Sequence, residues 1–188
     1  VGPPRIGSSV APLAIGAGMV LPALARAREE ARRAVCKSNL AQIGKACVAY
    51  TVDHGDRMPA SLADLVPQYL ADGRVLVCPS DGGDIPHLRN GLPCSYRYVG
   101  NLPAREAAPN TMVAYSRGEH EDGRNVLFYD GHVSWMTETA FQAELARQRK
   151  ELWEPLLKRG AKEINAARVK AFLEDEPYDE TQEAKPGK

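Results

Sequence analysis

A single long helical segment dominates the first third of the sequence. Helical character strengthens from Met19 and continues to about Val52. In the second half of this segment, apolar side chains recur at spacings of four, three, four and three, which places them on one face of a helix. They are Cys36, Leu40, Ile43, Cys47 and Tyr50. The first half carries no such stripe. The pattern therefore predicts a helix whose C-terminal half packs on a globular body while its N-terminal half projects.

The sequence at the start of this helix is apolar but rich in helix-breaking residues. Residues 6–25 carry no charge, and about twenty residues are enough for a helix to cross a bilayer. Three glycines, two serines and two prolines in the same stretch weaken that interpretation. Two interpretations remain: a segment for a membrane or filament core, or a flexible leader before a soluble helix. A cleaved signal peptide fits poorly, because no loop separates the apolar run from the helix.

The middle of the chain has the pattern of a small antiparallel sheet. Short apolar runs separated by Gly, Pro and Asn predict strands at residues 75–77, 95–99, 111–115, 125–129 and 132–136. Asp130 and Gly131 join the last two strands, a strong hairpin signal because both central positions of a type I′ turn need positive φ. A short helix at residues 61–70 begins with a Ser61/Asp64 capping box. The predicted fold class is α+β, with one long N-terminal helix packed on this sheet.

Beyond the sheet the sequence returns to a helical pattern. Phe141, Leu145 and Leu152 form an apolar face, Pro155 interrupts the helix, and a weaker helical stretch covers residues 161–173. The acidic end of the chain has the composition of a disordered tail. The sequence therefore divides into an apolar N-terminal segment (1–25), a stem helix with an α+β domain (26–136), C-terminal helices (137–174) and a disordered acidic tail (175–188).

Charge and histidine context weigh against two classes of function. The formal net charge is zero, so no overall field attracts nucleic acid or acidic membranes. The four histidines lack the context of an activated nucleophile, such as an elbow around a serine. The aromatic residues of the predicted strands fall at alternate positions, as core residues do. We therefore expect neither an enzyme nor a nucleic-acid-binding protein.

The four cysteines leave one disulfide open. Cys36 and Cys47 lie roughly 16 Å apart along a helix, which is beyond disulfide reach. Cys78 and Cys94 flank a loop rich in Gly, Pro and Asp. They either form a disulfide, which would stabilise the fold by about 3 kcal/mol in an oxidising compartment, or remain two small buried thiols. No Cys and His spacing in the sequence is typical of a structural zinc site.

The stretch from His120 to Gly131 combines metal-ligand side chains with a turn. His120, Asp122 and Asp130 could share a cation such as Ca²⁺ only if the loop before the hairpin folds back, because residues 125–129 span roughly 16 Å when extended. The alternative assigns the His120 side chain to hydrogen bonds with the loop backbone, and Asp130 with Gly131 to the turn. The sequence favours the second interpretation, and it predicts no cofactor besides this candidate Ca²⁺.

Five segments together resemble the type IV pilin-like proteins, specifically pseudopilin-like proteins with a His-x9-Asp-Gly motif near the C-terminus. They are residues 21–46, 50–59, 75–81, 95–100 and 120–136, the last reading HEDGRNVLFYDGHVSWM. The resemblance covers about residues 19–150. It implies a subunit that is inserted in the inner membrane, trimmed by a prepilin peptidase and N-methylated. It further implies extraction into a type IV pilus or type II secretion pseudopilus, in which the N-terminal helices of many copies bundle.

The resemblance assigns assembly to the N-terminal helix. The residues concerned are Leu21, Pro22, Leu24, Arg26, Arg28, Arg32 and Arg33. On a register that takes Val1 as the first mature residue, Pro22 occupies the place of the family's helix proline. Arg5 then stands where the family has a glutamate. The arginines either form salt bridges between subunits or line a solvated helix face.

These features predict a structural subunit of a type IV pilus-like or pseudopilus filament. Its partners would be copies of itself, other pilin-like subunits and, before assembly, the inner membrane. Its final location would be a periplasmic or extracellular filament. The alternative is a membrane-anchored extracytoplasmic binding module, with or without dependence on a cation, that does not polymerise.

Overall fold

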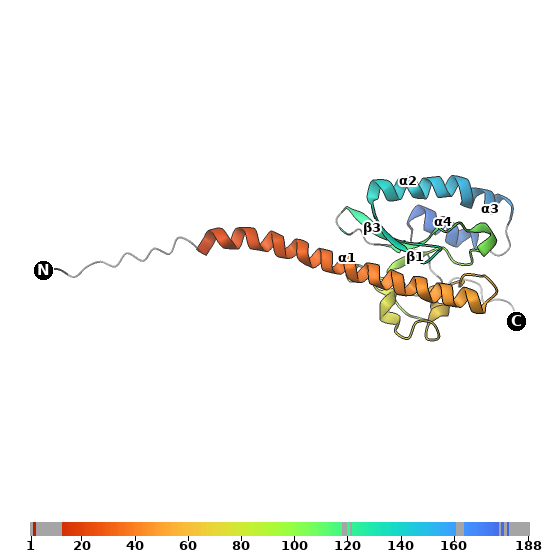
Figure 1. Ribbon diagram of the computed structural model, residues 1–188, viewed down its shortest axis with the longest axis horizontal. Helices are drawn as coiled ribbons and strands as arrows, with labels where there is room; N and C mark the ends of the chain where they lie inside the picture. The colour runs from red at the N-terminus through yellow and green to blue at the C-terminus, as the bar shows by residue number, and fades with distance from the viewer. Residues whose placement is uncertain are drawn as a thin grey trace.

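The long helix is present and divides into two halves. The computed structural model describes residues 2, 13–117, 120, 122–160, 164–176, 178 and 180, with the backbone alone for residues 13–19. The first helix, α1, spans Leu13–Asp53. Its C-terminal half lies against the body and its N-terminal half extends away from it (Figure 1). Cys36, Leu40 and Ile43 are fully buried. The predicted packed and projecting halves are confirmed.

The sheet is a four-stranded antiparallel meander. Its strands are β1 (Tyr96–Tyr98), β2 (Met112–Ser116), β3 (Gly123–Phe128) and β4 (Val133–Thr137). Each strand pairs with the next in sequence, in the order β1-β2-β3-β4. Four of the five predicted strands are therefore confirmed within a residue or two. Together with α1 they form the α+β fold that the sequence predicts.

The predicted strand at residues 75–77 is wrong. The chain forms a 3₁₀ turn there, η2 (Gly73–Leu76). Asp72 begins this turn, because its side chain accepts a hydrogen bond from the backbone N–H of Arg74 at 2.9 Å. An apolar run with high strand propensity is thus overridden by a local cap and by the packing of Leu76 into the core.

The predicted short helix at residues 61–70 is only one turn long. The turn is η1 (Leu62–Leu65), and the Ser61/Asp64 capping box is present as predicted. Val66 leaves the helical conformation, with φ −103° and ψ 130°. It does so because the following proline, Pro67, disfavours a helical residue before it.

The hairpin between β3 and β4 is confirmed, but its predicted turn type is wrong. Gly131 has φ 89°, whereas Asp130 does not have positive φ. The turn closes through a hydrogen bond from the Gly131 N–H to the Phe128 carbonyl at 2.9 Å. The Asp130 carboxylate accepts a hydrogen bond from the His132 N–H at 3.0 Å. This local bond stabilises the turn, since an Asp side chain can accept a hydrogen bond from the backbone two residues on.

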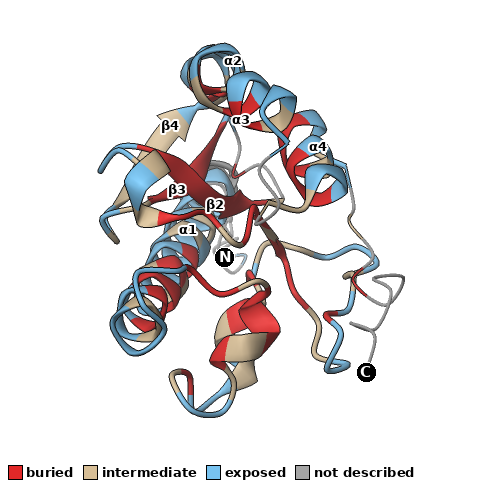
Figure 2. Cartoon of the chain, turned by 90° about the vertical axis from the view of Figure 1, so that its right-hand side faces the viewer, coloured by how far each residue is buried: buried red, intermediate tan, exposed pale blue. Residues whose placement is uncertain are grey.

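The sheet lies between two helical layers. The long helix covers one face, and α2 (Glu138–Gln148), α3 (Glu154–Lys158) and α4 (Ala166–Glu174) cover the other (Figure 2). A π-helical turn, η4 (Arg149–Trp153), connects α2 to α3, so the helical path continues across Pro155 instead of ending there. Strands β2 and β3 are buried along their whole length. The sequence predicts helices in both layers, but it does not predict that the C-terminal helices cover the second face of the sheet.

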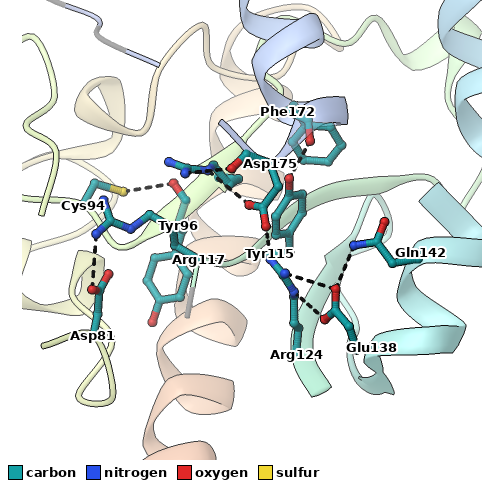
Figure 3. Close-up of polar contacts among 11 residues, drawn as sticks. Asp81, Cys94, Tyr96, Tyr115, Arg117, Arg124, Glu138, Gln142, Phe172 and Asp175 are labelled. Carbon is teal, nitrogen blue, oxygen red and sulfur yellow. Dashed lines mark hydrogen bonds and ion pairs between the residues drawn. The ribbon is translucent and has the colours of Figure 1, made fainter. Parts of the chain in front are cut away.

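Hydrogen bonds and ion pairs fasten α4 to the sheet (Figure 3). The Tyr115 hydroxyl on β2 donates to the Phe172 carbonyl at 2.5 Å. Just beyond α4, Asp175 pairs with Arg124 of β3 at 2.5 Å, and its carbonyl accepts from Arg97 of β1 at 3.1 Å. The C-terminal helices therefore belong to the folded body.

Part of the predicted disordered tail is ordered. Asp175 and Glu180 both lie in the segment 175–188, yet Glu180 is buried and accepts from the Ser61 hydroxyl at 2.5 Å. It also pairs with the buried guanidinium of Arg168 at 2.8 Å. Residues 177, 179 and 181–188 lie outside the described residues, so the prediction is wrong for the two acids and stays a prediction for the remainder.

None of the helices in the described ranges combines the length and the apolar character needed to span a membrane. Residues 3–12, where the predicted apolar segment begins, are not among the described residues.

Candidate functional site

Three metal-ligand side chains from distant parts of the sequence meet inside the body. Cys36 lies on α1, Cys78 follows η2, and His120 lies between β2 and β3. Their two Sγ atoms and one imidazole nitrogen all lie within 4.8 Å of one another. The three residues are between 0% and 1% exposed. We refer to them as the Cys–Cys–His cluster.

Local hydrogen bonds hold two members of the cluster, Cys78 and His120, in place. The Asn39 side chain of α1 donates to the Val77 carbonyl at 3.1 Å, which fixes the segment that carries Cys78. The His120 N–H donates to the Gly123 carbonyl at 2.9 Å, which ties His120 to the first residue of β3. Cys36 needs no such device, because it occupies the buried stripe of α1.

A carboxylate on α1 orients the imidazole of His120. The Nδ1 atom of His120 lies 2.9 Å from Oε1 of Glu29, and the Ser80 hydroxyl donates to the same oxygen at 3.0 Å. Glu29 precedes Cys36 by seven residues, about two helical turns, so both side chains lie on one face of α1. If Nδ1 carries the proton that Glu29 accepts, the lone pair of Nε2 is directed at the thiols.

Hydrogen bonds outweigh the effect of burial on the pKa of both members of this pair. Burial would lower the pKa of His120, but hydrogen bonds with Cys78 and Glu29 outweigh it and raise that pKa. Burial would likewise raise the pKa of Glu29, yet its hydrogen bonds with His120 and Ser80 lower it. Glu29 therefore remains a carboxylate and a strong acceptor for the imidazole N–H.

The two thiols are inequivalent. A hydrogen bond with Cys78 lowers the pKa of Cys36 against the opposing effect of burial, and a bond with Asn125 adds to it. The same bond with Cys36, together with burial, raises the pKa of Cys78. Cys78 lies 3.5 Å from Nε2 of His120, so the imidazole contacts the thiol that holds its proton more tightly.

The Cys78–His120–Glu29 alignment has the order of groups found in cysteine nucleophiles, but not their properties. A reactive cysteine is partly exposed and has a lowered pKa. Cys78 is buried and its pKa is raised. Two thiols and an imidazole in a buried cluster are instead suited to binding a soft or borderline metal ion.

The predicted Ca²⁺ ligand set is wrong. His120 and Asp130 lie beyond opposite ends of β3, whose six residues span roughly 17–20 Å. The Asp130 carboxylate pairs with Nδ1 of His132 at 2.5 Å at the hairpin. Asp122 is exposed, and its carbonyl accepts the N–H of Glu138 at 2.9 Å. The alternative prediction for His120, a side chain hydrogen-bonded to the loop backbone, is wrong as well, because its two ring nitrogens contact Glu29 and Cys78.

The candidate disulfide between Cys78 and Cys94 is also wrong, because all four cysteines are free. Cys78 points into the cluster, whereas the Cys94 thiol donates to the Tyr96 carbonyl at 3.6 Å. Burial raises the pKa of Cys94 to about 12. The alternative of two small buried thiols is therefore the one that the structure contains.

The residues predicted to mediate assembly lie on the exposed part of α1. They are Leu21, Pro22, Leu24, Arg26, Arg28 and Arg32, with Arg33 partly buried. Arg32 donates to Glu29 at 3.4 Å, and the guanidinium of Arg33 stacks over the Trp135 ring at 4.5 Å from its centroid. Arg33 thus marks the level at which α1 meets the sheet.

A family model described as "Protein of unknown function (DUF1559)" matches residues 25–65. The matched segment contains Glu29, Cys36 and the η1 turn, but neither Cys78 nor His120. No curated protein and no solved structure matches the chain. The class that the fold itself defines is an α+β body carried on a long N-terminal helix, an arrangement consistent with pilin-like proteins.

Proposed function

We propose that the protein is a structural, non-enzymatic subunit of a type IV pilus-like or pseudopilus filament. The N-terminal halves of α1 from many copies would bundle into the filament core, and the α+β bodies would lie on the outside. This places the assembled protein outside the cytoplasm, with the inner membrane as its location before assembly.

The observation that carries the proposal is apolar surface on a helix that no described residue covers. Residues 20–28 are all exposed, and the side chains of Val20, Leu21 and Leu24 are 53%, 68% and 49% exposed. Residues 13–28 of α1 extend roughly 24 Å at the helical rise of about 1.5 Å per residue. Isolated helical segments of this length are marginally stable in water, so a partner helix would stabilise this half of α1.

A second copy of α1 could provide this partner helix, because the exposed half of α1 carries both apolar and charged side chains. Burying a leucine or valine side chain contributes about 1.5–3 kcal/mol when it is fully exposed beforehand. Arg26 and Arg28 lie within about one helical turn of Glu29 and Glu30, so neighbouring helices can pair opposite charges. An identical helix offers both the apolar and the charged complement.

A pair of matched variants of α1 tests the proposal. Leu21→Glu combined with Leu24→Glu should abolish assembly of the full-length chain in sedimentation assays, because buried unpaired carboxylates cost several kcal/mol. Val52→Glu is the control, since Val52 is 76% exposed on the same helix but at the end that packs on the body. It should assemble as the parent chain does. Equal assembly of the double variant and the control would contradict the proposal.

A further inference from the structure

We propose that Cys36, Cys78 and His120 bind one zinc ion, which clamps the stem helix to the body. The inference rests on the Cys–Cys–His cluster and does not depend on filament formation. It makes Glu29 a positioning residue that acts on zinc through His120.

The spacing of the donor atoms fits a tetrahedral ion. Zinc lies about 2.3 Å from thiolate sulfur and about 2.0–2.1 Å from imidazole nitrogen, so sulfur and nitrogen ligands lie about 3.6 Å apart. The Cys78 Sγ and the His120 Nε2 lie 3.5 Å apart. With all three donors within 4.8 Å of one another, small side-chain rotations bring Cys36 to the same ion.

The outer contacts match those of zinc-binding histidines. Such a histidine donates its second ring N–H to a carboxylate or carbonyl, which fixes the ring and makes the ligating nitrogen more basic. Nδ1 of His120 has that partner in Glu29 at 2.9 Å. Ser80 in turn holds the same carboxylate oxygen at 3.0 Å. The arrangement is complete before any ion enters.

Two buried oxygens beside the cluster are candidates for the fourth ligand. Ser116 Oγ on β2 and Asn125 Oδ1 on β3 have no hydrogen-bond partner within the part of the chain that the structure describes. Both side chains lie beside the Cys36 thiol and lower its pKa. Buried polar atoms without a partner usually mark a water or an ion. The fourth position would therefore be filled by one of these oxygens or by a water bound to them.

Charge and ligand type select zinc. Two thiolates neutralise a divalent ion, so the filled site adds no net charge to the core, and both thiols lose their protons on binding. Thiolate and imidazole ligands in a tetrahedral arrangement are typical of Zn²⁺, whereas Ca²⁺ and Mg²⁺ take oxygen ligands. A surface hollow lined by Glu29, Glu30, Arg33 and His120 gives an ion an entry path.

The position of the site explains what the ion would do. One ligand comes from α1, one from the segment after η2, and one from the loop before β3. Glu29 and Cys36 lie where α1 leaves the body, immediately after the exposed residues 20–28. A zinc ion there would fix the direction in which the stem helix projects.

Metal titration of the reduced, chelator-treated full-length chain tests the proposal. We expect one Co²⁺ per chain, with the visible bands of tetrahedral cobalt and thiolate-to-cobalt charge transfer, and displacement of Co²⁺ by Zn²⁺. Zinc should raise Tm by roughly 5–10 °C at about 100 times its dissociation constant. Cys36→Ser and Cys78→Ser each leave one thiolate ligand and should lose at least half of the charge-transfer intensity. Cys47→Ala and Cys94→Ala remove buried thiols outside the cluster and should retain it.

The variant Glu29→Gln tests whether Glu29 acts on the ion through His120 or only packs beside the cluster. Because Glu29 contacts His120 and not the ion, this variant should bind Co²⁺ with an unchanged spectrum but about 10–100-fold more weakly. Absence of one-to-one binding by the parent chain would overturn the proposal. So would a charge-transfer band of undiminished intensity in Cys36→Ser, or a Cys36–Cys78 disulfide that mass spectrometry finds in the isolated protein and that zinc does not prevent.

Discussion

Replacement of Gly123 by alanine is expected to lower the free energy of unfolding by about 2–3 kcal/mol. A Cβ atom at this position would lie 2.3 Å from the Met136 carbonyl oxygen and 2.6 Å from the Trp135 ring. The carbonyl belongs to the β4 backbone and cannot move without separating β4 from β3. For a chain of this size the loss corresponds to a fall in Tm of roughly 4–12 °C.

Gly82→Ala is the matched control for this variant. No atom lies within 4 Å of a Cβ built at Gly82, and its φ is not positive. Its stability should change by less than about 0.5 kcal/mol. Thermal unfolding of both variants, followed by circular dichroism, gives the comparison. Equal Tm values for the two variants would show that the close approach of β4 to Gly123 is not rigid.

Replacement of Glu180 by alanine should cost about 3–5 kcal/mol, because it removes one partner of a buried ion pair. The side chains of Arg168 and Glu180 are 2% and 6% exposed, and their ion pair measures 2.8 Å. Glu180 also accepts hydrogen bonds from the Ser61 hydroxyl and from the Arg89 N–H. A single residue near the C-terminus thus ties α4 to the η1 turn and to the loop that follows η2.

Glu176→Ala controls for the loss of an acidic residue from the same segment. Glu176 is exposed, so its replacement should change stability by less than about 0.5 kcal/mol. Denaturant unfolding of the two variants measures the difference directly. If Glu180→Ala is as stable as Glu176→Ala, the segment around residue 180 does not dock on the body in solution.

The sequence predicts the main elements where the signal is local and periodic. The spacing of Cys36, Leu40 and Ile43 predicts the packed half of α1, because the period of a helix alone places them on one face. The Asp130 and Gly131 pair predicts the hairpin because these two residue types favour a tight turn, although the turn uses one positive φ and not two. Signals of this kind do not depend on the remainder of the chain.

Predictions fail where a partner far along the chain decides the conformation. The acidic composition around Glu180 predicts disorder, since it holds few apolar residues to bury. Its order comes instead from Arg168 and Ser61, which no composition rule can link to it. The docking of the C-terminal helices on the sheet likewise depends on distant contacts, such as those of Tyr115 with Phe141 and Phe172.

The Cys–Cys–His cluster could not be predicted from spacing. Cys36, Cys78 and His120 are each 42 residues from the next, and only the packing of α1 on the sheet brings them together. One local signal was available: Glu29 precedes Cys36 by seven residues, which places a carboxylate and a thiol on one helix face. The spacing from His120 to Asp130 follows from the strand between them: His120 bonds to the first residue of β3, and Asp130 lies in the hairpin turn after β3.

Electron microscopy of the purified full-length chain tests the central claim, assembly through the projecting half of α1. We expect filaments whose core consists of bundled N-terminal helices and whose surface carries the α+β bodies. Monodisperse single copies at every protein concentration and salt concentration would contradict the claim. They would favour an anchored binding module that does not polymerise.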